Sequence, residues 1–438
     1  MRTSTSPAPH RVVIVGGGAG GLELAAQLGR RFGPQAITLV DARPMHIWKP
    51  SLHEAAAGTL DIQQEGLTYL VLAQLNRFSF VLGGLTSVDR EARKITVSAV
   101  VSPDGEEVVP ERVIAYDTLV MAVGSTSNFF GTQGAEAHAV TLDTVEQAER
   151  FRLLMLKAMY QLNERRDRDE QAKLNLVIVG AGATGVELAV ELYEAGHVVS
   201  AYGLRNFKPS RDMVITIIEG GPRILGALPE KISEAAYNRL SQVGVRVETN
   251  CRVAEVRPGS VLTGDGREFP ADLCMWAAGI KGQPVLDALD LPQNRIGQLE
   301  VDARLHTSDP HILALGDCAS APWRDGRSVP ARAQAAHQQA DYLGKLLGAR
   351  IRGQAEPQTG YVYEDHGSLV SLGQDAGVGS LMGKLTGRGL FVSGTLARLM
   401  YMSLHLMHHK AILGIGRTAT LALARLLMKR TQSRVKLH

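Results

Sequence analysis

The sequence has 438 residues, of which 45% are hydrophobic and 46 are glycines, so it is long enough for two or three domains of a globular α/β protein. Its three separated cysteines exclude a disulfide framework and any C-x-x-C centre, which predicts a reducing, intracellular compartment, and its N-terminus lacks the apolar core of a signal peptide. The net charge of +3 hides an asymmetry: residues 376–438 hold ten of the 47 Lys and Arg and no Asp or Glu, which predicts a polyanionic partner for that end of the chain.

The first predicted unit is a strand, a glycine-rich turn and a helix, written VVIVGGGAGGLELAAQL. Gly16, Gly18 and Gly21 form the pattern G-x-G-x-x-G. The first glycine permits the tight turn, the second lets a phosphate approach the backbone, and the third lets the helix pack on the strand. The next strand ends at Asp41, where a carboxylate can accept hydrogen bonds from ribose hydroxyls. This unit is therefore predicted to bind a dinucleotide.

A mixed region follows, with strand-like segments at 80–88 and 94–101. A buried strand at 117–125 ends in small residues, and we include its Gly124 among the predicted cofactor-binding residues. Residues 144–166 have the periodicity of a helix that leads into a second unit.

The second unit, LNLVIVGAGATGVELAVEL, repeats the pattern at Gly180, Gly182 and Gly185. The next predicted strand ends at Glu219, after a longer insertion than usual. A carboxylate there repels a 2′-phosphate and favours NADH over NADPH, although the nearby Arg223 weakens this preference. Two dinucleotide sites in one chain are explained if NADH in the second passes a hydride to FAD in the first. Asp317, which follows a later strand in LALGDCAS, is expected to return to the FAD domain and bond the ribityl chain.

These features together resemble the type II NADH dehydrogenases, which are single-subunit NADH:quinone oxidoreductases. The resemblance covers roughly residues 10–430 and rests on the two glycine-rich units and on the strings IWKPSLHEAAAG, DTLVMAVGSTSNFFG, MWAAGI, LALGDCA and ARAQAAHQQA. It implies an α/β fold of two Rossmann-like dinucleotide-binding domains, for FAD and NADH, and a C-terminal amphipathic helical region that associates with the membrane. It also implies electron transfer from NADH through FAD to a membrane quinone without proton pumping.

The same resemblance implies roles for particular residues. Gln334 and Gln338 lie in the A-Q-x-A-x-Q pattern of the family's quinone-site helix, and Glu187 matches a glutamate between the NADH and quinone sites. Lys49 matches a basic residue near the flavin, and Gly279 is expected to let the backbone approach the nicotinamide nucleotide. From the residues alone, Glu187 is also explained as a first-turn helix carboxylate and Lys49 as a solvated lysine.

The predicted organisation has four parts. Residues 1–145 begin the FAD-binding domain, residues 146–290 form the NADH-binding domain, and residues 291–348 return to the FAD-binding domain with the quinone-site helix. Residues 349–438 form a strand pair at 361–373 and a tail that is helical from Leu390.

The tail is apolar and basic, but its charges recur too often for a membrane-spanning helix. On a helical wheel Arg417, Arg425 and Lys429 share one arc, and Leu423, Leu426 and Leu427 point to the opposite side. This pattern predicts a helix in the membrane interface with its basic face toward anionic headgroups, at the cytoplasmic face of the cell membrane. A helix pair packed on the body or in a homodimer is the alternative. The tail is too apolar for a nucleic-acid partner.

We predict no metal site, and we expect His405, His408 and His409 to be interfacial rather than metal ligands. Disulfide reductase and sulfide:quinone reductase chemistry are disfavoured, because the cysteines form no pair near the flavin. Cys251 and Cys274 are expected on core strands. Two other functions remain open: a soluble NADH-dependent ferredoxin- or rubredoxin-type reductase, and an NADH-responsive flavoprotein sensor.

Overall fold

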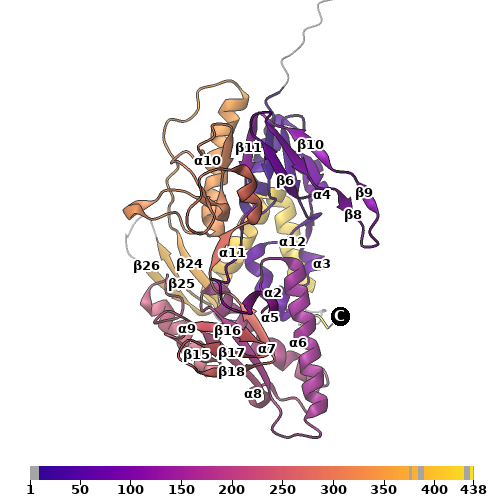
Figure 1. Ribbon diagram of the computed structural model, residues 1–438, viewed down its shortest axis with the longest axis vertical. Helices are drawn as coiled ribbons and strands as arrows, with labels where there is room; N and C mark the ends of the chain where they lie inside the picture. The colour runs from indigo at the N-terminus through magenta and orange to yellow at the C-terminus, as the bar shows by residue number, and fades with distance from the viewer. Residues whose placement is uncertain (1–8, 374–376, 383–388, 429–434, 438) are drawn as a thin grey trace, which may run out of the picture.

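A computed structural model describes residues 9–373, 377–382, 389–428 and 435–437. Two bodies, each built on a parallel sheet, lie one above the other in Figure 1, and the C-terminal helices run between them. Each body begins with a buried strand, a glycine-rich turn and a helix, so the duplicated sequence pattern appears as a duplicated structure.

The first sheet has the strand order β22-β11-β1-β2-β5, with every neighbouring pair parallel. Its strands are β1 (Val12–Val15), β2 (Ile37–Asp41), β5 (Ser79–Leu82), β11 (Thr118–Met121) and β22 (Ile312–Ala314). The helices α1 (Ala19–Phe32) and α10 (Ala333–Ile351) pack against each other, and α4 (Tyr69–Asn76) packs on α1. Because β22 pairs with β11, the chain returns to this sheet after the second body is complete.

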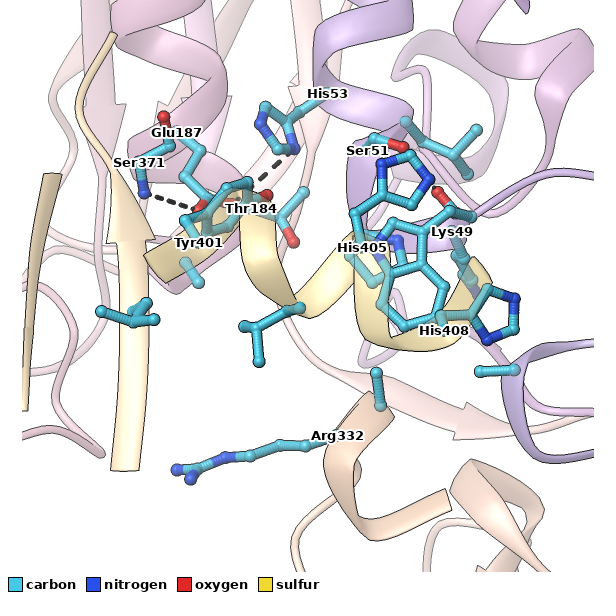
Figure 2. Close-up of a pocket in the computed structure, with 18 of the residues that line it drawn as sticks. Lys49, Ser51, His53, Thr184, Glu187, Arg332, Ser371, Tyr401, His405 and His408 are labelled. Atoms are coloured by element: carbon cyan, nitrogen blue, oxygen red, sulfur yellow. Dashed lines mark hydrogen bonds and ion pairs between the residues drawn. The ribbon is translucent and has the colours of Figure 1, made fainter. Parts of the chain in front are cut away.

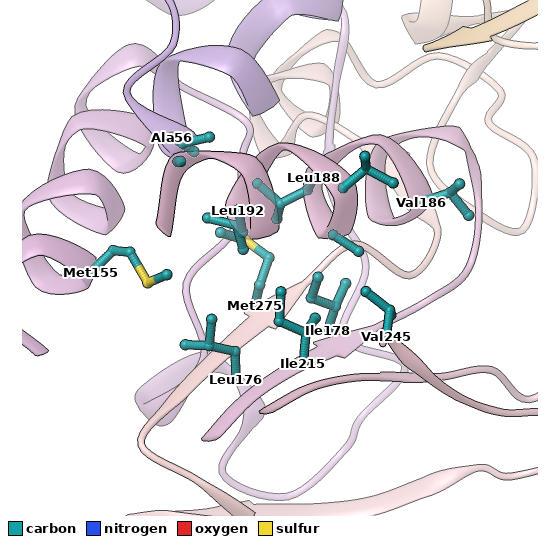
Figure 3. Packing of buried hydrophobic residues seen from close by; sticks show 14 of the residues in the cluster. Ala56, Met155, Leu176, Ile178, Val186, Leu188, Leu192, Ile215, Val245 and Met275 are labelled. Carbon is teal, nitrogen blue, oxygen red and sulfur yellow. The ribbon is translucent and has the colours of Figure 1, made fainter. Parts of the chain in front are cut away.

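The second sheet has the parallel order β15-β14-β13-β19. Its strands are β13 (Leu174–Val179), β14 (Met213–Ile218), β15 (Arg246–Glu248) and β19 (Leu273–Trp276), and its main helices are α6 (Val145–Arg165), α7 (Ala183–Ala201) and α9 (Glu230–Gln242). Figure 3 shows apolar side chains of α7 packed on β13, β14 and β19, with Ala56 and Met155 closing one side. This dry contact fixes the N-terminal end of α7 against the sheet.

Short elements complete the two bodies. Antiparallel sheets are formed by β6 (Leu85–Asp89), β7 (Lys94–Val97) and β10 (Arg112–Ala115), and by β16 (Val253–Arg257), β17 (Gly259–Thr263) and β18 (Glu268–Ala271). Two-stranded pairs are β3 (Met45–His46) with β4 (Leu67–Thr68), β8 (Val100–Val101) with β9 (Glu107–Val109), β12 (Ser125–Ser127) with β20 (Ile280–Gly282), and β21 (Leu299–Glu300) with β23 (Ala319–Ser320). The remaining helical turns are α2 (Leu52–Ala57), α3 (Ile62–Glu65), α5 (Ala135–His138), α8 (Pro209–Asp212), η1 (Lys49–Ser51), η2 (Pro284–Leu289), η3 (Gly316–Cys318) and η4 (Arg324–Gly326).

The C-terminal region is an antiparallel sheet followed by two helices. The sheet contains β24 (Gly367–Ser371), β25 (Gly377–Met382) and β26 (Gly389–Ser393), and the helices are α11 (Gly394–Leu413) and α12 (Ile415–Met428). Two predictions were wrong here. Residues 361–366 have no strand, and the chain from Leu390 continues as strand β26 before α11 begins. Pairing of β26 with β25 buries Val392 and overrides the helical preference of the sequence.

Helix α11 contacts α1, α4 and the C-terminal sheet, so it connects the two bodies (Figure 1). At its end, the Asn76 amide donates a hydrogen bond to the Ile412 carbonyl over 2.9 Å. Among the residues that the structure describes, no helix combines the length and hydropathy needed to cross a bilayer.

Candidate active site

The first glycine-rich turn has the geometry that its spacing predicts. Gly16 has φ +105°, and a Cβ there would overlap the Ala122 carbonyl. A Cβ on Gly21 would overlap the Gly16 carbonyl, so this position must be glycine for α1 to pack on β1. Gly18, the N-cap of α1, has no heavy atom within 4 Å of the place where a Cβ would lie. The helix terminus therefore faces open space that suits a pyrophosphate.

The second turn repeats this geometry. Gly180 has φ +103°, and its Cβ would come within 2.8 Å of the Ala277 backbone. A Cβ on Gly185 would overlap the Gly180 carbonyl, while Gly182, the N-cap of α7, again faces open space. Both turns therefore have the geometry for a dinucleotide, and the three glycines of the second turn repeat the geometry of the first.

The acidic residues at the two strand ends brace the turns. Asp41 Oδ2 accepts a hydrogen bond from the Gly17 amide over 2.6 Å. Glu219 Oε2 accepts one from the Ala181 amide, and Oε1 accepts one from the Gly221 amide, both over 2.7 Å. Burial raises the pKa of Asp41, and the bond from Gly17 opposes that effect. The two carboxylates therefore hold the loops, and their contact with ribose hydroxyls stays a prediction.

Arg223 does not oppose Glu219. Its guanidinium donates to the carbonyls of Gly226 and Leu228, each over 2.8 Å, so it binds the loop that directly follows it in the sequence. Arg223 therefore does not weaken the predicted preference for NADH at Glu219, which stays a prediction.

A cavity of ≈ 2070 Å³ reaches both turns. It is open between the N-termini of α1 and α7 and is walled by α10 and α11; Figure 2 shows part of its lining. The predicted site residues that line it are Gly18, Lys49, Gly124, Gly182, Glu187, Gly279, Asp317, Gln334 and Gln338. The predicted residues Gly16, Gly21, Asp41, Gly180, Gly185 and Glu219 are not in its lining and act from beneath or behind the turns.

Lys49 and Asp317 form a polar wall through Ser125. The Ser125 hydroxyl donates to Asp317 Oδ2, and the Lys49 ammonium donates to the Ser125 carbonyl, each over 2.9 Å. Lys49 Nζ also lies 3.8 Å from Asp143. Lys49 is thus anchored at the cavity instead of being a freely solvated lysine. Gly279, at φ +67°, is needed locally because a Cβ there would overlap the Phe130 ring.

Glu187 is a buried acid at the meeting of the two bodies. Its Oε1 accepts a hydrogen bond from the Ser371 amide over 2.9 Å, and its Oε2 lies 3.7 Å from His53 Nδ1 (Figure 2). Burial raises the pKa of Glu187 well above its ordinary value, and the neighbouring carboxylates of Glu54 and Glu191 raise it further. Burial lowers the pKa of His53 to about 4. A protonated Glu187 beside a neutral imidazole is suited to donate a proton at neutral pH.

Gln334 and Gln338 shape the opposite wall. The Gln334 amide donates to the Gly367 carbonyl over 3.0 Å and accepts from the His366 amide over 3.2 Å. Gln338 makes the same pair of bonds with the backbone of Glu364, over 2.8 and 3.0 Å. Both side chains therefore hold residues 364–367, which come directly before and at the start of β24, against α10. Both also line the cavity.

A buried chain of histidines around Glu23 was missed from the sequence. Glu23 Oε1 lies 2.6 Å from His408 Nδ1, and Oε2 is hydrogen-bonded to His337 Nδ1. His408 Nε2 lies 2.8 Å from His46 Nε2. His408 and His409 are 2% and 3% exposed, so the prediction that the tail histidines are interfacial was wrong for both, because α11 packs on α1. The available signal was Glu23 itself, a carboxylate on the buried face of the first fingerprint helix.

The cysteines give no support to thiol chemistry. All three are free and buried, and burial raises the pKa of Cys274 and Cys318 to about 12. Cys274 lies on β19, but Cys251 lies in the turn between β15 and β16, contrary to prediction. Over the described residues, no group of three or more His, Cys, Asp or Glu side chains is arranged to hold a metal ion.

The architecture and the doubled dinucleotide turn define a class. The family model for pyridine nucleotide-disulphide oxidoreductases matches residues 10–340, and the chain belongs to this family. A type II NADH:quinone oxidoreductase of Haemophilus influenzae is 39% identical to it, over 98% of this chain and 99% of the relative. A demethylphylloquinone reductase of Synechocystis is 30% identical, over 90% and 91%. The structure of NDH2 from Plasmodium falciparum in complex with NADH has a TM-score of 0.81 at 18% identity, over 98% and 100%.

Within that class, the chain is a member of the type II NADH:quinone oxidoreductases.

Proposed function

We propose that the protein passes two electrons from NADH through FAD to a membrane quinone and pumps no protons. The observation that carries this function is the single cavity that reaches both dinucleotide turns and Glu187. When bound, FAD supplies the redox chemistry by accepting electrons from NADH and delivering them to the quinone. The relatives named as quinone oxidoreductases favour this activity over a ferredoxin-type reductase or a sensor.

The chain itself supplies binding and position. Gly16, Gly18 and Gly21 cradle the FAD pyrophosphate, with Asp41 at its ribose. Lys49, Gly124 and Asp317 face the flavin end. The NADH pyrophosphate takes the turn of Gly180, Gly182 and Gly185, with Glu219 at the ribose and Gly279 near the nicotinamide. Alignment of the two reacting rings accounts for most of the catalytic effect on hydride transfer.

The quinone end of the cavity lies between α10 and Glu187 in this proposal. Gln334 and Gln338 form its wall, and Glu187 holds a proton at Oε1 or Oε2 for the quinone oxygen. This assignment is supported by the burial of Glu187 in the same cavity as both glutamines.

The membrane surface is assigned to α12. Ile415, Leu423 and Leu427 are 71%, 58% and 61% exposed, and Arg417 is exposed beside them. The prediction that Arg425 lies on the basic, membrane-facing side was wrong, because Arg425 forms an ion pair with Glu65 of α3 and faces the body. Lys429 lies outside the described residues, as does the side chain of Leu426. We therefore assign the apolar face, with Arg417 beside it, to the anionic cytoplasmic leaflet as a peripheral anchor.

Removing this apolar face is expected to release the protein from membranes. Each exposed leucine contributes about 1.5 kcal/mol when buried in lipid. The double variant Leu423→Ser, Leu427→Ser should therefore partition roughly 100-fold less onto anionic vesicles in a co-sedimentation assay. The control Val101→Ser, Val108→Ser changes two equally exposed valines on the β8–β9 arm and should bind like the parent. Equal partitioning of both variants would contradict the assignment of the membrane surface to α12. A molecular mass in solution that is doubled in the parent but not in the leucine variant would indicate a homodimer through this face.

An anaerobic absorbance titration tests the function itself. NADH should bleach the oxidised flavin band of the FAD-loaded protein, and a short-chain quinone should restore it. An absence of bleaching would contradict the assignment of NADH as the electron donor. Bleaching without recovery would contradict the assignment of quinone as the electron acceptor and would favour a protein acceptor such as a ferredoxin.

A further inference from the structure

We propose that Glu23, His408 and His337 form a second proton-holding site of the cavity, which supplies one of the two quinol protons and refills from water through His337. This inference rests on the proposed quinone reduction. Glu23, His337 and His408 all line the cavity, yet none belongs to the Glu187 cluster.

The position of one proton follows from the hydrogen-bond partners. His46 Nδ1 lies 2.9 Å from the Gly17 carbonyl, which can only accept, so Nδ1 carries a hydrogen. Burial lowers the pKa of His46 to about 3, so its Nε2 is bare and accepts. His408 must then donate through Nε2, over 2.8 Å. A single proton remains for the 2.6 Å link between His408 Nδ1 and Glu23 Oε1.

That proton gives the pair two forms, imidazolium with carboxylate or imidazole with carboxylic acid. Burial alone would raise the pKa of Glu23, but the hydrogen bonds from His337 and His408 outweigh it and lower the pKa below its ordinary value. Glu23 therefore favours its carboxylate form. Loss of that proton leaves a bare nitrogen facing a carboxylate oxygen over 2.6 Å, so the pair has a strong tendency to take up a replacement proton.

The chain of bonds has one open end. Toward His46 it stops at the Gly17 carbonyl, which cannot pass a proton on. Toward α10, Glu23 Oε2 is hydrogen-bonded to His337 Nδ1, while His337 Nε2 lies 3.8 Å from Asp341. The His337 side chain is 36% exposed and Asp341 is 57% exposed, so water reaches this end.

The groups packed around the pair do not compete for its proton. On α11, His405 is half-buried and His409 is buried, and burial lowers the pKa of each to about 3, so both are neutral. Arg425 on α12 is paired with Glu65. The hydrogen bond that His337 donates to Glu23 raises the pKa of His337, so His337 is protonated below that raised value and loses its proton as pH rises through it.

The step balances for the overall reaction, in which NADH, quinone and one proton from water give NAD⁺ and quinol. Glu187 gives one quinol proton and regains a proton that originates in the hydride of NADH. For the other, the N–H bond of the His408–Glu23 pair breaks and a quinol O–H bond forms. Both electrons come from NADH by way of FAD, and the pair regains its proton through His337.

The test uses Glu23→Gln in the FAD-loaded full chain. A glutamine can accept from His337 through its oxygen and donate to His408 through its nitrogen, so all hydrogen bonds survive while the labile proton is lost. We expect bleaching by NADH to be unchanged, and reoxidation by quinone to slow about 10-fold or more with an altered solvent deuterium isotope effect. Replacing the half-exposed His337 in His337→Asn should remove only the part of the alkaline decline of reoxidation that belongs to His337 and keep the part that belongs to Glu187. The control His197→Gln, which changes an exposed histidine outside the cavity, should keep the whole decline.

Two readouts separate this site from structural effects and from the function itself. A pH indicator should record slower proton uptake during flavin reoxidation in Glu23→Gln than in the parent, because each quinol still requires one proton from water. An unchanged pH profile, isotope effect and proton uptake would overturn the proposal, as would a loss of bleaching and reoxidation in equal measure with a lower melting temperature. If the parent itself is not reoxidised by quinone, the proposed function fails instead.

Discussion

Gly182→Val is expected to yield a folded, yellow protein that NADH no longer reduces. The residue has an ordinary extended φ of −69°, and no heavy atom lies within 4 Å of the added Cβ, so the fold accommodates valine. The added methyl groups enter the space at the N-terminus of α7 where the pyrophosphate accepts backbone hydrogen bonds. Loss of about two such charge-assisted bonds costs roughly 3–6 kcal/mol, or about 10²–10⁴-fold in NADH affinity.

Gly18→Val is the matched control, because Gly18 has the same position, the same open surroundings and a φ of −65° at the N-terminus of α1. It should lose FAD and purify without colour, while Gly182→Val keeps FAD and is still bleached by dithionite. Flavin content and anaerobic NADH titration measure the two outcomes. NADH reduction of Gly182→Val at the parental concentration would refute the assignment of the second turn.

Glu187→Gln should slow flavin reoxidation by quinone about 100-fold while leaving reduction by NADH intact. The parental carboxyl has a pKa raised well above its ordinary value by burial, so it is protonated at neutral pH and ionises as pH rises through that raised value. Parental reoxidation should accordingly be constant at low pH and fall on the alkaline side. The glutamine variant, which cannot supply a proton, should show a low rate without this decline.

The same substitution should not destabilise the fold at neutral pH. When the pKa of a carboxyl is raised in the folded state, the folded state loses stability as pH rises from the unfolded pKa toward the folded pKa. The reason is that the carboxyl ionises freely only in the unfolded chain. Glutamine mimics the neutral form and can still accept from the Ser371 amide, so its melting temperature should equal or exceed that of the parent above pH 5. Stopped-flow absorbance and thermal melts at several pH values check both statements, and a parental pH profile in the variant would contradict the role of Glu187.

The parts of this site that local sequence predicts are those that depend on local geometry. The roles of Gly16 and Gly180 follow from neighbours within a few residues, since each must adopt a positive φ between a strand and a helix. Asp41 and Glu219 each stand at the end of the strand that follows their turn, as predicted, although an insertion makes the second interval longer.

The contacts that the sequence did not predict join distant segments. Glu23 and His408 are 385 residues apart, and no periodicity links them. The ion pair of Arg425 with Glu65 likewise redirects a side chain that the helical wheel assigned to the basic face. Strand β26 forms because β25 offers it a ladder, which is a tertiary effect that its own residues do not specify.

The return of β22 to the first sheet also determines when this protein can acquire its flavin. The second sheet is complete once the ribosome has added residue 276, but the first still lacks β22, and α1 still lacks its partner α10, which ends at Ile351. During synthesis the NADH-binding body can therefore fold while the FAD-binding body waits as an unfinished sheet with an exposed edge at β11. We expect nascent chains stalled before residue 312 to bind no FAD, so that cofactor loading is a late event in the life of each molecule.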